Sequence, residues 1–192
     1  MTPAEALLEL HEYWAKANDC ALKDSASRPV FGSGNPEARV VFIGEAPGKK
    51  EDEIGIPFVG AAGKFLSEML ESIGMVRDDI YITNIVKYRP PNNRDPEPEE
   101  KKACEEWLYA ELSFIKPDLI VFLGRHSMND FFPTEKISSV HGKLIIKKFA
   151  HIPTTHFLPL YHPAAALYNG GMRDELMKDF KKIQLALKKI ST

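Results

Sequence analysis

The chain has 192 residues, of which 44% are hydrophobic and 27% charged, and its formal net charge is -2. This length fits one globular domain with a sizeable core, since chains of roughly 150 residues bury about 70% of their unfolded surface. No apolar run approaches the roughly 20 residues that span a bilayer, and the first residues lack a signal-peptide pattern. We therefore expect a soluble, cytoplasmic protein with no membrane partner.

Charge is distributed unevenly along the chain. Residues 1–142 contain 16 basic and 24 acidic side chains, whereas residues 143–192 contain 9 basic and 3 acidic. A near-neutral total argues against a nucleic-acid partner, because such domains are usually basic. The basic C-terminal segment indicates either an interaction surface or a final helix with lysines on its solvent face.

Helix and strand patterns alternate from the N-terminus onward. The expected elements of the first half are helices at 3–17 and 62–73 and buried strands at 39–44 and 80–86. Segments rich in Gly, Pro, Ser or Asn predict loops at 25–36, 55–63 and 89–94.

The second half continues the alternation. We expect helices at 98–115 and 173–190, strands at 119–123, 143–149 and 155–160, and a short helix after Gly124. Several of the strands are apolar throughout, which is typical of a parallel sheet covered on both faces. The sequence predicts one domain over residues 1–192, an α/β/α three-layer sandwich around a mainly parallel sheet of about four strands.

Polar side chains follow three of the expected strands. Glu45 lies in a Gly-Glu-Ala-Pro-Gly turn, Asn84 ends the second strand, and His162 follows the last. Ligands of such sheets bind beyond the carboxyl ends of the strands. Phe58 lies in a glycine-rich loop between the first two strands. Taken singly, each of these residues could be a turn, a local cap or a packed core residue.

Together these motifs resemble the family 4 uracil-DNA glycosylases over nearly the whole chain, from about Leu8 to Ile190. The segments that carry the resemblance are Gly44–Gly48, Glu51-Asp52, Gly55–Gly60, Ala62-Gly63, Tyr81–Asn84, Lys87–Pro91, Asn93-Arg94 and His162-Pro163. The resemblance implies the uracil-DNA glycosylase-like fold and a monofunctional hydrolase that excises uracil from DNA in base-excision repair. It leaves an abasic site.

The resemblance assigns base recognition to Phe58, Asn84 and Glu51. A base inside a duplex must be flipped out before it can react, and Phe58 offers a face for the flipped ring. The Asn84 amide carries a donor and an acceptor, which match uracil O4 and N3 and mismatch cytosine. Glu51 is expected beside C5 of the base, where a thymine methyl would clash.

The resemblance assigns catalysis to Glu45 and His162. His162 is expected to donate to uracil O2 as negative charge develops there. Glu45 is expected to orient or activate water and to offset positive charge on the sugar. Ala46 follows it, where relatives outside family 4 have a polar side chain, so more of the chemistry depends on Glu45.

Several loop residues are candidates for contact with DNA. Leu167 and Tyr168 could wedge into the gap left by the flipped nucleotide, although Leu167 could also be ordinary packing. The other candidate DNA contacts are Lys87, Arg89, Asn93, Arg94, Lys143 and Arg173.

The cysteines depart from the family pattern. Family 4 members hold a [4Fe–4S] cluster through four cysteines, and this chain has two. Cys20 and Cys104 match two ligand positions, whereas Ala17 and Tyr88 stand at the other two. We therefore expect no metal ligands and no iron–sulfur cofactor, with Cys20 and Cys104 either free or paired.

Three alternatives remain at the level of sequence. The protein could prefer another deaminated base such as hypoxanthine, or it could bind uracil-containing or abasic DNA with weak catalysis. A Rossmann-type nucleotide-binding module is disfavoured, because the chain lacks both Gly-x-Gly-x-x-Gly and a Walker loop. The expected partner is uracil-containing DNA, and the expected state is a monomer.

Overall fold

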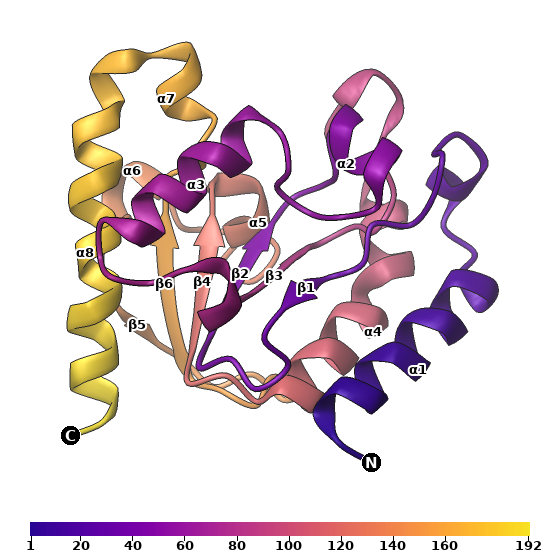
Figure 1. Ribbon diagram of the computed structural model, residues 1–192, viewed down its shortest axis with the longest axis horizontal. Helices are drawn as coiled ribbons and strands as arrows, with labels where there is room; N and C mark the ends of the chain where they lie inside the picture. Colours follow the sequence, from indigo (N-terminus) through magenta and orange to yellow (C-terminus); the bar gives the residue numbers. More distant parts are fainter.

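The computed structural model describes residues 1–192 and contains a six-stranded sheet in the order β1-β3-β2-β4-β6-β5. Its four central strands run parallel to one another, as predicted. They are β2 (Val40–Gly44), β3 (Tyr81–Asn84), β4 (Leu119–Leu123) and β6 (His156–Leu160). Their carboxyl ends lie at one edge of the sheet, and both chain termini lie at the opposite end of the molecule (Figure 1).

Two short antiparallel strands complete the sheet. β1 (Ser33–Gly34) pairs with β3, and β5 (Ile145–Ile146) pairs with β6. The sequence predicts a loop at the first position and a strand over 143–149 at the second. Only two residues of the second segment pair, because lysines lie on both sides of them. Charged side chains are typical of sheet edges, where they discourage further pairing.

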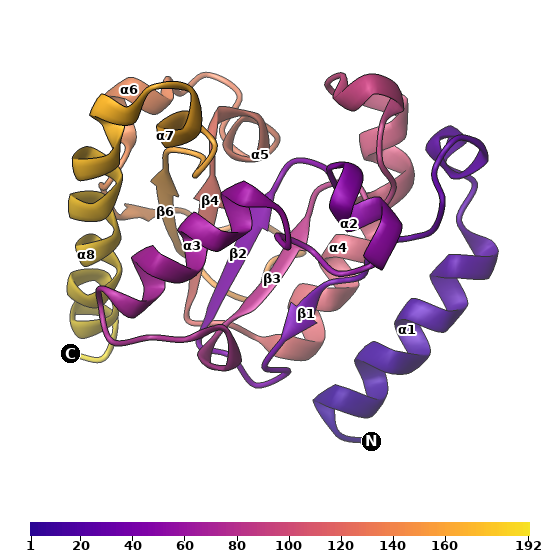
Figure 2. The same ribbon diagram turned by 45° about the horizontal axis from the view of Figure 1, so that its top comes forward.

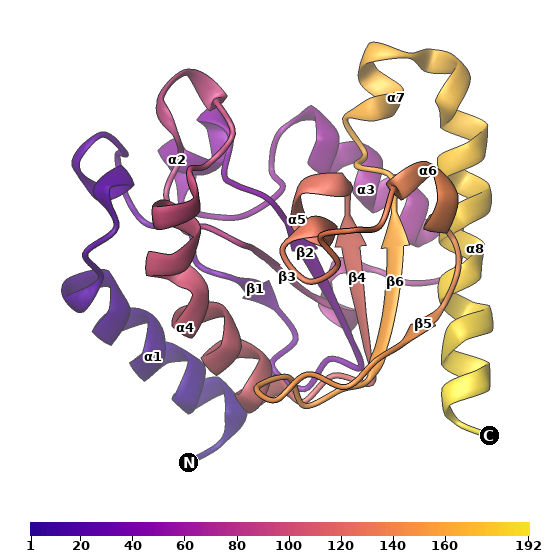
Figure 3. The ribbon, with the colours of Figure 1, turned by 180° about the vertical axis from the view of Figure 1, so that it is seen from behind.

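Four helices cover the two faces of the sheet. α1 (Pro3–Ala17) and α4 (Pro98–Ile115) lie on one face, and α3 (Ala61–Glu71) and α8 (Arg173–Ile190) lie on the other (Figures 1 and 3). This arrangement confirms the predicted three-layer sandwich. The bounds of α1, α4 and α8 match the predicted ranges. None of the helices is both long enough and apolar enough to cross a membrane.

The remaining helices are short and lie in the connections. They are α2 (Lys49–Ile54), α5 (Arg125–Asn129), α6 (Ile137–Val140) and α7 (Ala165–Tyr168), with single 3₁₀ turns at Ala21–Asp24, Arg77–Asp79, Pro91–Asn93 and Gly170–Met172. The sequence does not predict α2, because its six residues include five charged ones and show no apolar periodicity.

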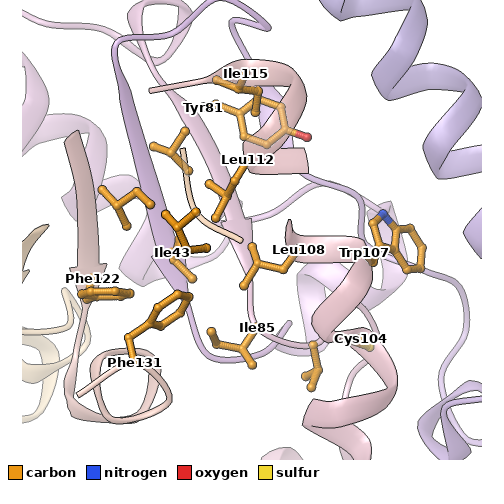
Figure 4. Packing of buried hydrophobic residues seen from close by; sticks show 14 of the residues in the cluster. Ile43, Tyr81, Ile85, Cys104, Trp107, Leu108, Leu112, Ile115, Phe122 and Phe131 are labelled. Atoms are coloured by element: carbon orange, nitrogen blue, oxygen red, sulfur yellow. The ribbon is translucent and has the colours of Figure 1, made fainter. Parts of the chain in front are cut away.

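The core on the α4 face combines apolar packing with a buried polar chain. Figure 4 shows Leu108 and Leu112 of α4 directed at the sheet, with Trp107 on another side of the helix. The Trp107 indole Nε1 donates to Nδ1 of His11 at 3.1 Å, and Nε2 of His11 lies 3.3 Å from the Tyr81 hydroxyl. Tyr81 in turn donates to Glu111 at 3.2 Å.

Lys87 lies at the end of this buried series of hydrogen bonds. The expectation that it contacts phosphate is wrong. Its side chain is fully buried, and Nζ lies 2.5 Å from Oε2 of Glu111. Nζ also donates to the Thr83 hydroxyl and, at 2.9 Å, to the backbone oxygen of Asn84. A buried charge needs such partners, so Lys87 stabilises the end of β3 and is unavailable to DNA.

Candidate active site

The polar residues predicted from the strand ends meet at one cavity. Gly44 and Asn84 are partners in the parallel β2–β3 register, so Glu45 and Asn84 emerge side by side. His162 follows β6 at the same edge, which Figure 2 brings forward, with α2, α5 and α7 around the strand ends. A cavity of about 270 Å³ lies between these groups.

Most of the predicted site residues line this cavity. Those in its wall are Glu45, Glu51, Phe58, Asn84, Asn93, Arg94, His162 and Tyr168. The predicted DNA contacts Arg89, Leu167 and Arg173 lie outside its wall. The volume is small beside the roughly 300–1,000 Å³ of sites for drug-sized ligands, and it suits a single base.

Asn84 is buried, and its side-chain oxygen has no partner. Its side chain is 2% exposed, and Oδ1 has no hydrogen-bond partner within the protein. Gly44 makes room for it, since a Cβ at position 44 would collide with Oδ1 and lie 2.8 Å from Cζ of Phe58. A buried amide oxygen without a partner, in a residue that lines a cavity, is a ready acceptor for a ligand N–H.

Phe58 closes one side of the cavity from a constrained loop. Its backbone has φ of 55°, a left-handed conformation that non-glycine residues rarely adopt. Arg77 supports this turn with its guanidinium, which donates to the carbonyl oxygens of Pro57, Phe58 and Gly63. Nothing in the local sequence indicates this role of Arg77, because it depends on backbone oxygens up to 20 residues away.

Glu51 supports the same loop from the other side. Its Oε1 accepts hydrogen bonds from the backbone N–H groups of Val59 and Gly60, each at 2.9 Å. These two amides lie just before α3, where backbone donors have no partner within the helix. Glu51 therefore holds the Phe58 loop, and its predicted position beside C5 of the base stays a prediction.

His162 has a defined tautomer and is neutral at physiological pH. Its Nδ1 accepts from the backbone N–H of Ala164 at 3.0 Å, so the proton of the neutral ring is on Nε2. Burial, followed by the nearby His126, lowers the pKa of His162 to about 4. The ring centroid lies 5.7 Å from that of Phe58. His162 thus offers a neutral N–H donor beside the Phe58 ring.

Glu45 is a carboxyl group poised near neutrality. Oε1 is buried without a hydrogen-bond partner. Burial, followed by the negative charge of Asp95, raises the pKa of Glu45 to about 7, while Lys101 and Arg125 oppose the shift. A carboxyl group with a pKa near 7 is suited to exchange protons at physiological pH.

The structure also places His126 and Asp95 beside Glu45, which sequence reasoning did not predict. His126, in α5, follows β4, and its Nδ1 lies 3.5 Å from Oε1 of Glu45. The same nitrogen lies 3.8 Å from Oδ2 of Asp95. The sequence contains a signal for His126, because it follows β4 in the same way that Glu45, Asn84 and His162 lie at the ends of their strands.

The candidate DNA contacts differ in how free they are. Leu167 is 52% exposed and Tyr168 is 92% exposed, so neither side chain is ordinary core packing. Arg94 is held by Glu100 at 2.6 Å, and Arg173 pairs with Glu68. Arg89 donates a hydrogen bond to the Asn93 side chain at 2.8 Å. The Lys143 amine donates to the backbone oxygen of Ser139.

The residues at the family's cluster positions do not fit a four-cysteine cluster. Cys20 and Cys104 are buried and unpaired, and the interaction between their thiols raises the pKa of Cys104 and lowers that of Cys20. Ala17 has no donor atom. Tyr88 is 1% exposed, packs edge-on against Trp107, and burial raises its pKa to about 12. Two thiols and a protonated phenol replace four thiolates.

Comparison with known proteins agrees with this geometry. Residues 31–188 match the family model described as the uracil DNA glycosylase superfamily. The chain is 45% identical to the Type-4 uracil-DNA glycosylase of Sulfurisphaera tokodaii over 94% of this chain and 84% of the relative. The corresponding enzyme of Archaeoglobus fulgidus is 48% identical over 85% of this chain and 84% of the relative. The Type-4 uracil-DNA glycosylase of Thermotoga maritima is 39% identical over 98% of this chain and 99% of the relative. The chain therefore belongs to the uracil DNA glycosylase superfamily and, within it, to the Type-4 uracil-DNA glycosylases, enzymes that hydrolyse the bond between uracil and deoxyribose in DNA.

Proposed function

We propose that this protein flips uracil out of DNA and excises it, with Asn84 identifying the base and Glu45 and His162 breaking the bond. The observation that carries the proposal is the unpartnered Oδ1 of Asn84, a buried residue in the wall of the cavity that Phe58 closes. Uracil N3–H donates to this oxygen, and uracil O4 accepts from the amide nitrogen. Cytosine presents the reverse pattern at both positions, so a fixed amide rejects it.

Binding energy for the flipped base comes from stacking on Phe58. Base–aromatic stacking contributes about 1–3 kcal/mol per base, which offsets a large part of the cost of extruding a nucleotide. The loop that carries Phe58 is already fixed by Arg77 and Glu51. Little ordering is therefore needed when the base arrives.

Bond cleavage uses the two proposed catalytic groups on opposite sides of the bond. Negative charge develops on uracil O2 as the base departs, and the neutral Nε2–H of His162 stabilises it. The ionised Glu45 carboxylate faces the sugar, offsets the positive charge that develops there, and orients the attacking water. Water adds to the sugar carbon, its proton passes to Glu45, and the base leaves as an anion.

DNA contacts surround the cavity in this proposal. Tyr168 and Leu167, both exposed on α7, fill the gap left by the flipped nucleotide. Arg89, Asn93, Arg94 and Arg173 contact the strand, and these contacts require Arg94 and Arg173 to exchange their carboxylate partners for phosphates.

We further propose that the protein works as a single domain and without an iron–sulfur cluster. This follows from the donor set, since Ala17 supplies no ligand atom and the Tyr88 ring is packed into the core. Iron analysis and visible absorption of protein purified without oxygen test the cluster, and cluster absorption would contradict the proposal. The monomeric state and cytoplasmic location stay predictions, and light scattering tests the first.

An excision assay tests the central proposal. The protein is incubated with a labelled oligonucleotide that contains one uracil, and alkali then cleaves abasic sites. We expect a shorter product from uracil opposite guanine and none from cytosine or thymine. Parallel substrates with hypoxanthine test the other base preference. Retained binding without any product would contradict the proposal and favour a uracil-DNA binding protein.

A further inference from the structure

Beside the candidate active site, outside the cavity wall, lies a histidine to which the reaction described above assigns no role. His126 is the second residue of α5, directly after β4, and its side chain is 34% exposed. Its Nδ1 faces two carboxylates that come from other elements. Oε1 of Glu45, after β2, is 3.5 Å away, and Oδ2 of Asp95, in the segment before α4, is 3.8 Å away.

A neighbouring arginine determines where the imidazole proton lies. Nε of Arg125 donates to Nε2 of His126 at 3.3 Å. A guanidinium has donors and no acceptor, so Nε2 must be unprotonated in this contact. The proton of the neutral ring is therefore on Nδ1, the nitrogen that faces Glu45 and Asp95.

The Glu45 oxygen nearest to His126 is otherwise without a partner. Oε1 is buried and accepts no hydrogen bond in the protein. A separation of 3.5 Å is longer than a good hydrogen bond, but catalytic contacts are often loose before substrate binds and tighten in the complex. A small rotation of either side chain brings Nδ1–H onto this oxygen.

We propose that His126 is a positioning residue for Glu45, which holds the carboxylate through Nδ1–H and stabilises its ionised form. The proposal rests on the proposed function, in which the ionised Glu45 faces the sugar. Nδ1–H also stands between Glu45 and Asp95, whose like charges repel. His126 thus lets a carboxylate pair coexist at the strand ends while only Glu45 faces the reacting atoms.

The charged groups around Glu45 set the sign of the expected effect. Burial and then Asp95 raise the pKa of Glu45, and Asp130, which follows α5, acts in the same direction. Lys101 of α4 and Arg125 of α5 oppose them. A donor at Nδ1 of His126 favours the anion, so its removal makes Glu45 harder to ionise.

Single-turnover excision of uracil, measured from pH 5 to 9, tests this role. In His126→Ala, we expect the midpoint of the pH–rate profile to rise by about one unit. The rate at pH 7 then falls about fivefold, and the loss disappears near pH 9. His126→Asn keeps a donor near the position of Nδ1 and should restore most of the wild-type profile.

Two further variants frame the comparison. Asp95→Asn removes the repelling charge and should move the midpoint in the opposite direction, downward. His151→Gln changes an exposed histidine that stacks on Tyr109, outside the cavity wall, and should leave the profile unchanged. Thermal unfolding of all four variants checks that each is folded.

Carbon-13 NMR titration of the Glu45 carboxyl measures the same midpoint without substrate. This measurement tests the role of His126 independently of the proposed function. Even if the protein excises no uracil, the titration still shows whether His126 lowers the pH at which the Glu45 carboxyl is half ionised. A uniform loss of rate at every pH in His126→Ala, or an unmoved carboxyl titration, would overturn the role of His126. An upward shift in both measurements would support it.

Discussion

Three buried side-chain oxygens of this protein lack a hydrogen-bond partner, and they lie in two different regions. Oε1 of Glu45 and Oδ1 of Asn84 border the cavity at the carboxyl ends of the strands. The hydroxyl of Tyr88 lies in the packed core beside Cys20 and Cys104, where the family's cluster ligands would be. Two of these atoms therefore border the proposed base site, and the third lies at the positions that match the family's cluster ligands.

The difference shows when an unsatisfied polar atom is useful. Leaving such an atom buried costs about 1–3 kcal/mol in either region. In the proposed function, the base and the attacking water offset this cost at the cavity when they bind. In the Tyr88 region, under the proposed absence of a cluster, no ligand offsets it. Variants in the first region should change activity, and variants in the second should change stability.

Asn84→Ala should have the largest effect on activity. It removes the donor and the acceptor that recognise uracil, and we expect excision to fall roughly 10²–10³-fold. Single-turnover assays on uracil-containing oligonucleotides measure the loss, and the free energy of unfolding should change little. If this variant excised uracil at the wild-type rate, Oδ1 of Asn84 would have no part in recognition.

His162→Ala should slow cleavage by roughly 10²-fold, because the donor to uracil O2 is lost. Affinity for the same DNA, measured by fluorescence anisotropy, should change much less, since the donor acts mainly on charge that develops during cleavage. Equal losses in affinity and in rate would instead indicate a role in binding.

The pH dependence of the wild-type protein should be about tenfold between pH 6 and pH 8. The pKa of Glu45 is raised to about 7, so the group is mostly protonated at pH 6 and mostly ionised at pH 8. Because the ionised form is the active one, the rate rises with pH. His162, whose pKa is lowered to about 4, stays neutral throughout this range and cannot cause the change. Glu45→Gln should be slow and independent of pH.

Tyr88→Phe should have the smallest effect, and in the favourable direction. It keeps the buried ring and removes the unpartnered hydroxyl, so we expect the free energy of unfolding to rise by about 1 kcal/mol. Urea denaturation measures this change, and uracil excision should stay at the wild-type rate. Tyr109→Phe is a matched control, because the Tyr109 hydroxyl already bonds to Glu105 and its loss should bring no gain.

The sequence predicts the long elements of this fold well and the short ones poorly. α1 and α4 begin at prolines with capping residues before them and carry a clear apolar pattern, so their bounds follow from local chemistry. α2 and β1 are six and two residues long and depend on tertiary contacts. The pairing of β1 with β3, for example, joins residues almost 50 positions apart.

The same limit applies to the candidate site. Glu45, Asn84 and His162 could be predicted because parallel strands bring their carboxyl ends together. Lys87 was assigned wrongly to phosphate, since nothing local indicates that Glu111, 24 residues away, would bury it. Arg77 was missed for a similar reason, because its partners are the carbonyl oxygens of a distant loop.

The buried series of hydrogen bonds that begins at His11 limits how far this protein can be truncated at its N-terminal side. The family match covers residues 31–188 and so leaves out α1, although His11 of α1 bonds to Trp107 and approaches Tyr81. Through Glu111 and Lys87 these contacts reach the backbone of Asn84. An expressed fragment trimmed to the matched residues would uncover an indole and a phenol in the core and loosen the strand end that carries Asn84. The smallest autonomous unit of this enzyme therefore includes its first helix.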